Sequence, residues 1–184
     1  MAAMPQDVLT FWRTAGPAKW FARNDRFDDA IQLKFEPVHH AAARGQYDAW
    51  AHTAEGALAL IILLDQFPRN IYRGSAHAFA TDSKARAVAH IAVDAGHDRN
   101  VEPELRRFFY LPFEHSEDLG DQALSIRLFT RLKDETGDAE SLRWAVIHEE
   151  IIARFGRFPH RNACLGRITT PEEQAFLDDG GFAG

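Results

Sequence analysis

The sequence predicts an all-α fold of about eight helices, paired as antiparallel hairpins in a single domain over residues 1–184. Apolar residues recur at helical spacing along the chain, while strictly alternating apolar and polar patterns are scarce. Capping residues, glycine and proline bound the segments that have this spacing. One run, "ALALIILL" at residues 57–64, is apolar on every side, which is typical of a buried helix. A strand is the alternative interpretation of this run, but its alanine content and length favour a helix.

Three helices are predicted in the first part of the chain. The first covers residues 5–15 and begins with Pro5, in a first-turn position that tolerates proline. The second covers residues 25–44, and Pro37 should kink or split it. The third, residues 54–66, should be the buried central helix and should end before Pro68. One apolar stripe runs along the second helix: Phe27, Ile31, Phe35 and Val38.

Two shorter helices should follow. Thr81 is placed to cap a helix over residues 82–95, and Gly96 should stop it. The next helix, residues 103–111, should end before Pro112 because the residue ahead of a proline avoids the helical conformation.

Three further helices complete the prediction. Ser116 is the expected N-cap of a helix reaching about residue 133, with Leu124, Leu128 and Leu132 in register. Asp138 should cap a helix that ends at residue 155, ahead of Gly156. In "TPEEQAFLDDGG", Thr170 with Glu173 three residues later forms the capping-box signature of a short last helix.

Composition indicates an ordinary globular protein, with 46% hydrophobic and 26% charged residues. The lone Cys164 cannot form an internal disulfide, and no basic segment leads into an apolar run near the start. We therefore expect a cytoplasmic protein. The longest uncharged apolar stretch, residues 56–64, is less than half of the roughly 20 residues that a membrane span needs, so no membrane partner is expected.

The charged residues exclude one class of partner and suggest another. A net charge of −6 argues against a general nucleic-acid binder, which usually presents a basic face. Only four of the 21 basic residues are lysines, and the other 17 are arginines. Arginine presents a planar fork that suits carboxylates, phosphates and partly buried ion pairs. An arginine-rich but acidic protein indicates internal ion pairs or a local anion site.

Three polar segments should meet at one pole of the fold. Short connections make successive helices alternate in direction, so every second connection lies at the same end. By this parity "DQFPRNIYRG", "LPFEHSE" and "FGRFPHRNACLGR" share a pole. With the adjoining helix ends they carry six arginines against four acidic residues, a net +2, whereas the remainder carries −8. A basic pole would hold a small anion, helped by free N–H groups at the helix start near residue 116.

Asp65 should need an arginine partner in this region. It lies at the C-terminal end of a buried helix, where the helix dipole disfavours a negative charge. A buried carboxylate also costs several kcal/mol unless it is paired. Arg69 is the local candidate partner, and Arg157 or Arg161 are the candidates from across the pole.

The pole contains two related motifs, "FPRN" at residues 67–70 and "FPHRN" at residues 158–162. Phe67 and Phe158 should anchor them in the core, while Asn70 and Asn162 should bind loose backbone groups. Such a network can serve only to lock helix ends together, and this structural interpretation stands beside the functional one.

Other chemistry has weaker support. "HEE" at residues 148–150 begins like a zinc-protease helix, but Ile152 occupies the place of the second histidine. His115, Glu117 and His160 could meet at the pole and hold a metal ion, yet no ligand spacing requires one. Cys164 could be an activated thiol, although a single cysteine is more often a small packing residue. No cofactor motif is present, so no cofactor is expected.

Four stretches carry a resemblance to a known family: "WFARNDRFDDAI", "LLDQFPRNIYRGSAHAFATDSKA", "FFYLPFEHSEDLGDQ" and "RFGRFPHRNACLGRITTPEEQAFL". Together they span nearly the whole chain. They resemble the bacterial family called domain of unknown function 924, which is grouped with tetratricopeptide-like folds. The resemblance implies an all-α, right-handed array of helical hairpins, and it implies no activity, cofactor or catalytic residue.

The sequence therefore predicts a polar pocket at one pole that binds a small carboxylate or phosphate, with or without catalysis. If catalysis occurs, the candidate proton carriers are His115, His160 and Glu117. Two alternatives stay open, a tetratricopeptide-like module that binds a protein or peptide and a metal-dependent hydrolase. The predicted ligand-binding residues are Asp65, Gln66, Arg69, Asn70, Arg73, His115, Ser116, Glu117, Arg157, His160, Arg161 and Asn162.

Overall fold

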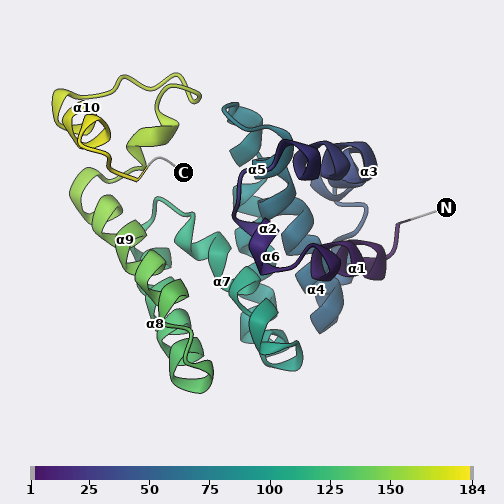
Figure 1. Cartoon of the computed structure of the whole chain (residues 1–184). Helices are drawn as coiled ribbons and strands as arrows, with labels where there is room; N and C mark the ends of the chain where they lie inside the picture. Colours follow the sequence, from purple (N-terminus) through teal and green to yellow (C-terminus); the bar gives the residue numbers. More distant parts are fainter. Residues whose placement is uncertain (1–2, 183–184) are drawn as a thin grey trace. The chain divides into compact units, whose positions relative to one another are not determined.

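The computed structural model describes residues 3–182, and within them every regular element is a helix (Figure 1). This confirms the predicted all-α class. The chain folds into two compact units. The first unit is the chain up to Arg73 together with His77–Pro112, and the second is Gly74–Ala76 together with the chain from Phe113 onward. The prediction of a single domain stays a prediction, and each unit is described by itself.

The first unit is built around α4, whose side chains are completely buried from Ala57 to the end of the helix. Helices α1 and α6 pack against α4, and α3 packs against α5. Large aromatic side chains, among them Trp12, Phe67 and Phe108, pack edge to face in the same core. The α-helices of this unit are α1 (Pro5–Ala15), α2 (Pro17–Trp20), α3 (Asp25–Ala43), α4 (Ala54–Ile61), α5 (Phe67–Ile71) and α6 (Asp82–Asp94).

The predicted third helix differs from the observed one, because it does not end at Pro68. After α4 the chain makes a π turn over Ile62–Gln66 and continues directly into α5. The N–H of Phe67 donates to the carbonyl of Ile62, five residues back. The wider turn accommodates the proline, which lacks an N–H and would clash with a carbonyl in a regular helix.

Thr81 is the N-cap residue of α6, but its side chain binds the π turn and not the start of the helix. Its hydroxyl donates to the carbonyl of Leu64, and Nδ1 of His39 lies 2.8 Å from the carbonyl of Leu63. Two buried side chains thus satisfy carbonyl groups in the irregular turn. Thr81 is therefore the N-cap residue of α6, as predicted, but its hydroxyl binds the π turn and makes no capping hydrogen bond.

Two other prolines lie inside helices instead of ending them. α3 continues through Pro37 without being split. The predicted fifth helix begins as a 3-10 turn, Pro103–Leu105, and α7 (Arg107–Glu114) then runs through Pro112. The side chains next to Pro112 are buried, so core packing outweighs the one hydrogen bond that a proline removes. α7 begins in the first unit, and its last two residues belong to the second.

The second unit contains the α8–α9 hairpin, whose two helices lie side by side and antiparallel (Figure 1). Asp138 caps α9 through the N–H of Ser141, and Gly156 ends it with φ of 68°, as predicted. Thr170 and Glu173 form the predicted capping box of α10. The elements of this unit are α8 (Leu119–Thr136), α9 (Ala139–Phe155), the 3-10 turn Pro159–Arg161 and α10 (Pro171–Asp178).

The predicted N-cap of α8 is wrong. Asp118, not Ser116, caps this helix, and its carboxylate accepts hydrogen bonds from the N–H groups of Gly120 and Asp121. Ser116 instead donates to the carboxylate of Asp121. Because Asp118 brings a negative charge to the helix start, this terminus does not add the anion-binding N–H groups that the sequence suggested.

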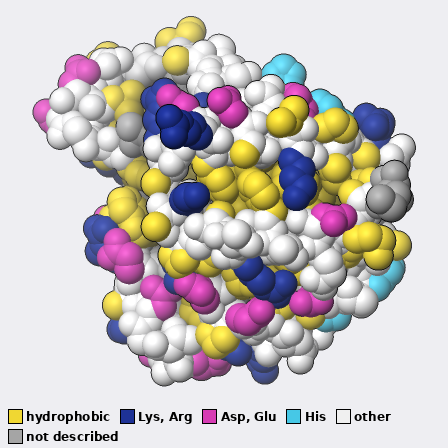
Figure 2. All heavy atoms as spheres, turned by 45° about the vertical axis from the view of Figure 1, so that its right-hand side comes forward, with side chains coloured by type: hydrophobic (Ala, Val, Ile, Leu, Met, Phe, Trp, Pro, Cys, Tyr) yellow, Lys and Arg dark blue, Asp and Glu magenta, His cyan; other side chains and the backbone are white. Residues whose placement is uncertain are grey.

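On the face shown in Figure 2, basic and acidic side chains are interspersed, with hydrophobic side chains exposed between them. Among the described residues, no helix combines the length and the apolar character required to cross a membrane.

Candidate functional site

The twelve predicted site residues divide between the two units. Asp65, Gln66, Arg69, Asn70 and Arg73 lie in the first, and His115, Ser116, Glu117, Arg157, His160, Arg161 and Asn162 lie in the second. The common pole on which the sequence argument depended stays a prediction.

In the first unit Asp65 is fully buried and has the local partner that the sequence predicted. Nη1 of Arg69, one helical turn later, lies 3.1 Å from its Oδ1, and the amide of Gln66 donates to its Oδ2 at 2.6 Å. The same guanidinium binds both carboxylate oxygens of Asp82, at 2.8 and 3.0 Å. Arg69 therefore connects the end of the π turn to the start of α6.

Asn70 and Arg73 both bind Asp28 on α3. The Asn70 amide donates to Oδ1 at 2.7 Å, and Nε and Nη2 of Arg73 donate to the same carboxylate. The prediction that Asn70 binds backbone groups is wrong, because its partner is this carboxylate. Arg69 and Arg73 are thus each committed to an acidic residue of the protein.

In the second unit Glu117 joins two loops. Its carboxylate accepts two hydrogen bonds from Arg167, at 2.8 and 2.9 Å, and one from the N–H of Phe158 at 3.0 Å. Burial alone would raise the pKa of Glu117, but these hydrogen bonds and the charges of Arg167 and Arg161 lower it below its usual value. Glu117 is therefore a carboxylate that holds the "FPHRN" segment in place, and it is poorly suited to carry protons.

Glu173, like Glu117, accepts hydrogen bonds from several side chains. Arg157 donates to both of its oxygens, at 2.6 and 2.8 Å, and Asn162 donates to one of them at 3.2 Å. The hydrogen bonds from Arg157 lower the pKa of Glu173 to about 2. Asn162, like Asn70, binds a carboxylate instead of the loose backbone group expected from the sequence.

Around the buried ring of Phe158 lies a group of nitrogen-bearing side chains that we call the histidine cluster: His115, His148, His160 and Arg161. The His148 ring meets Phe158 edge to face with centroids 5.5 Å apart, and the His160 ring is 5.7 Å away. The guanidinium carbon of Arg161 lies 4.4 Å from the Phe158 centroid, and the ring of His115 lies 6.2 Å from that of His148. Segments distant in the sequence thus gather at one place within the second unit.

His148 is held neutral in this cluster. Burial, followed by the charges of His115, Arg161 and His160, lowers its pKa to about 3, although the carbonyl of Trp144 works in the opposite direction. Since that carbonyl can only accept, Nδ1 of His148 carries the proton of the 2.8 Å hydrogen bond. Oε1 of Glu114 lies 3.3 Å from the same nitrogen, but with a neutral imidazole this contact is not an ion pair.

Gln122 fixes the turn that carries His115 and Ser116. Its fully buried amide donates to the carbonyls of Glu114 and Ser116, at 2.7 and 2.6 Å. The sequence analysis missed Gln122, and it assigned no role to Glu114 and dismissed His148. A signal for Gln122 existed, because helical spacing places it on the same face as Ser125 and Phe129, both of which are buried.

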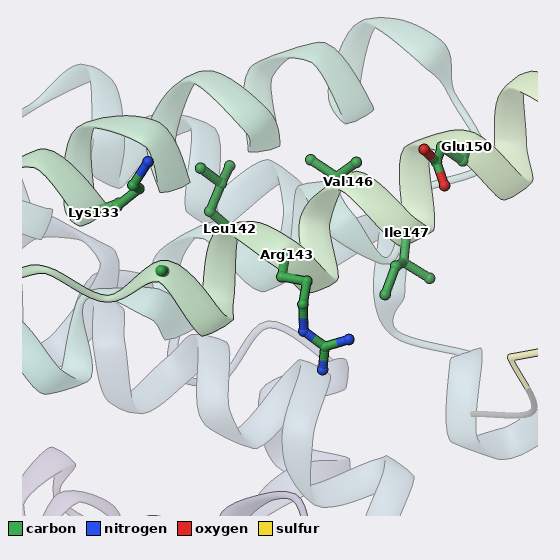
Figure 3. Close-up of a pocket in the computed structure, with 7 residues that line it drawn as sticks. Lys133, Leu142, Arg143, Val146, Ile147 and Glu150 are labelled. Atoms are coloured by element: carbon green, nitrogen blue, oxygen red, sulfur yellow. The ribbon is translucent and has the colours of Figure 1, made fainter.

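A shallow hollow of about 450 Å³ lies elsewhere in the second unit, on the α8–α9 hairpin (Figure 3). Leu142, Val146 and Ile147 of α9 form its apolar part, and the charged side chains of Lys133, Arg143 and Glu150 surround them. None of the predicted site residues lines it. The histidine cluster and this hollow are therefore separate candidate sites.

Comparisons with known proteins agree with the fold. A family model described as "Bacterial protein of unknown function (DUF924)" matches residues 8–181. The chain belongs to this family. It is also similar to the solved structure of the protein of unknown function ATU0120 from Agrobacterium tumefaciens, with 47% sequence identity and a TM-score of 0.91. That match covers 96% of this chain and 97% of the other. A search of curated proteins found no match. Membership of the DUF924 family names no reaction, so function is argued from the side chains.

Proposed function

We propose that this protein is a cytoplasmic, tetratricopeptide-like helical protein that binds a small carboxylate or phosphate at the histidine cluster. The observation that carries the proposal is the gathering of two imidazoles and one guanidinium around Phe158, with a third imidazole, that of His115, beside His148. The charge of Arg161, and those of His115 and His160 when these are protonated, help to lower the pKa of His148. An anion placed beside these groups would relieve that repulsion.

The arginine contacts rule out four guanidinium groups as ligand contacts. Arg69, Arg73, Arg157 and Arg167 each bind a carboxylate of the protein through two nitrogen atoms. Such fork-shaped pairs are strong and leave little of the guanidinium for a ligand. The structural interpretation therefore applies to these four arginines. We assign ligand contacts to His115, His160 and Arg161 because their contacts place all three in the histidine cluster.

Half-buried imidazoles also allow catalysis, and in this proposal His115 or His160 would transfer the proton. His148 stays neutral near pH 7 and donates a hydrogen bond through Nδ1, so it orients the cluster without changing charge. Glu117 remains an anchor for the loop.

The proposal is tested by measuring thermal stability with inorganic phosphate and with succinate. Binding at about 100 times the dissociation constant would stabilise the fold by about 2.7 kcal/mol. We expect Arg161→Ala to abolish this stabilisation while circular dichroism shows a folded protein. Affinity should be higher at pH 6 than at pH 8, because a protonated imidazole binds an anion more strongly.

Two further variants complete this experiment. His160→Asn tests the site without removing the buried guanidinium, in case Arg161→Ala does not fold. Arg143→Ala is the matched control, since Arg143 pairs with Glu140 on the exposed face of α9. An unchanged response to both anions in His160→Asn, or an equal loss in Arg143→Ala, overturns the proposal.

The hollow on α8–α9 favours a second function, which we propose as the alternative: docking of an apolar segment of a protein or peptide partner. Its aliphatic side chains and charged rim are suited to such a segment. Nile red, a neutral apolar dye, is the probe. Val146→Glu should abolish its fluorescence gain, and His160→Asn should not.

The metal-dependent hydrolase alternative has no ligand set in the described part of the chain, where no three His, Cys, Asp or Glu side chains are grouped to hold a metal ion. The metal-dependent hydrolase stays an alternative prediction.

A further inference from the structure

The segment that follows α10 turns back over the histidine cluster. The Phe182 ring meets His148 edge to face with centroids 4.5 Å apart, and it meets His160 at 5.2 Å and nearly at right angles. Trp144 of α9 lies 6.0 Å away on another side. One aromatic side chain therefore contacts two of the three imidazoles.

Two glycines make this return possible. Gly180 has φ of 79°, a conformation that residues with a side chain rarely adopt. The N–H of Gly181 donates to the carbonyl of Phe176 at 2.9 Å, which closes the end of α10. A Cβ atom on Gly181 would lie 2.5 Å from that carbonyl oxygen and 2.5 Å from the Phe176 ring. No side chain fits at this position, so the observed path depends on glycine.

Phe182 is held by apolar and aromatic contacts. Like Phe155 and Phe176, it packs against the buried cluster of Ile151, Ile152 and Phe158. The ring is only half-buried, in contrast to the fully buried Phe158. Segments whose side chains are only partly buried open at low free-energy cost compared with core helices.

We propose that residues 180–182 form a strap whose Phe182 ring covers His148 and His160, and that an anionic ligand enters when the strap swings out on Gly180–Gly181. The ligand in this inference rests on the proposed function, but the cover itself rests only on the contacts above. Glycine has the greatest backbone freedom of any residue, so the two glycines serve as the hinge. The closed ring covers one side of the His148 and His160 imidazoles, and opening would expose that side.

The cover can be tested without any ligand. Diethyl pyrocarbonate modifies neutral, accessible imidazoles, and peptide mass spectrometry gives the rate at each histidine. In Phe182→Ala we expect the rates at His148 and His160 to rise about tenfold, the factor that corresponds to losing one half-buried phenylalanine contact. Gly181→Ala should raise both rates with the ring still present, because the closed path no longer fits. The exposed His52 provides the internal reference for reagent concentration.

Phe155→Ala is the matched control for this experiment. Phe155 belongs to the same apolar cluster and packs against Phe176 at 5.1 Å, but its ring contacts are with that cluster and not with the imidazoles. It should destabilise the second unit to a similar extent while leaving the modification rates unchanged. Unchanged rates in either strap variant, or an equal rise in Phe155→Ala, overturn the strap.

A second arm links the strap to the anion site. The association rate of inorganic phosphate should rise in Phe182→Ala, since the covered state no longer delays entry. If phosphate binds neither the native protein nor this variant while the modification rates rise as expected, the strap holds and the proposed anion site fails. If phosphate binds the native protein and Phe182→Ala equally fast, the strap does not control entry. The inference then fails while the proposed anion site stands.

Discussion

At the scale of the residue, the motifs "FPRN" and "FPHRN" both anchor their segments through a phenylalanine and an asparagine. In each, the phenylalanine is fully buried and the asparagine donates to a carboxylate from a distant segment. Arg69 pairs with Asp65 and Asp82, and Arg161 stacks on Phe158 inside the histidine cluster. The extra residue between proline and arginine in the second motif is His160, which belongs to the proposed site.

The acid sensitivity of His148 is a prediction at this scale. Its pKa is about 3 in the folded protein and near 6.5 when unfolded, so the unfolded chain binds more protons between these values. Stability should therefore fall as the pH drops below 6.5. The expected contribution is about 1.5 kcal/mol between pH 6.5 and pH 5, measured by urea unfolding.

His148→Phe is the comparison, because it replaces the imidazole by a ring that does not titrate. The variant should lose this part of the pH dependence of stability. It should keep the part due to His39, because burial lowers the pKa of His39 as well. If the free energy of unfolding changes with pH by the same amount in the native protein and in His148→Phe, His148 is not the group responsible. Glu173 does not interfere, since its contribution is lost only as the pH falls below about 4.5 towards its folded value of about 2.

At the scale of the element, the sequence predicted best where the signal is local. The caps at Asp138 and Thr170 bind N–H groups within three residues, and both were predicted correctly. The pair of Asp65 and Arg69 was also predicted, because residues four apart share a helix face. The π turn was missed, since it depends on partners for Leu63 and Leu64 that come from other helices. For the same reason the sequence did not reveal that Glu173 would bind Arg157, which requires the loop between them to fold back.

Thr81→Val tests the support of the π turn. It removes the hydroxyl that donates to Leu64 and leaves a buried carbonyl without that bond, so we expect a loss of about 1–3 kcal/mol in the free energy of unfolding. Thr130→Val is the control, because the exposed Thr130 donates to a carbonyl of its own regular helix. A loss equal to that of the control would show that the turn does not depend on Thr81.

At the scale of the whole molecule, two compact units share one continuous helix, α7. The sequence predicted a single domain, and its parity argument placed the polar loops of both units at one pole. The parity argument counts only changes of chain direction, so it holds only where successive helices form regular hairpins. Additional short elements such as α2, α5 and several 3-10 turns interrupt that alternation and were not predicted from the sequence.

A single cooperative unfolding transition is expected if the chain is one domain. A helix shared by two units favours such coupling, because neither unit can unfold completely without disturbing α7. Trp144 belongs to the second unit and Trp12, Trp20 and Trp50 to the first, so Trp144→Phe leaves fluorescence that reports only the first. Midpoints from this variant's fluorescence and from circular dichroism should coincide. Separate midpoints would establish two independent domains.

The π turn has a consequence for insertions and deletions. It contains one residue more than a regular turn, so removing a single residue between Ile62 and Gln66 would restore uniform winding. Because the wider turn absorbs its extra residue, α5 would keep nearly the same orientation around the axis, and Arg69 would still face Asp82. Loss of one residue should therefore be tolerated better here than in α4, where it would turn every later residue by about 100°.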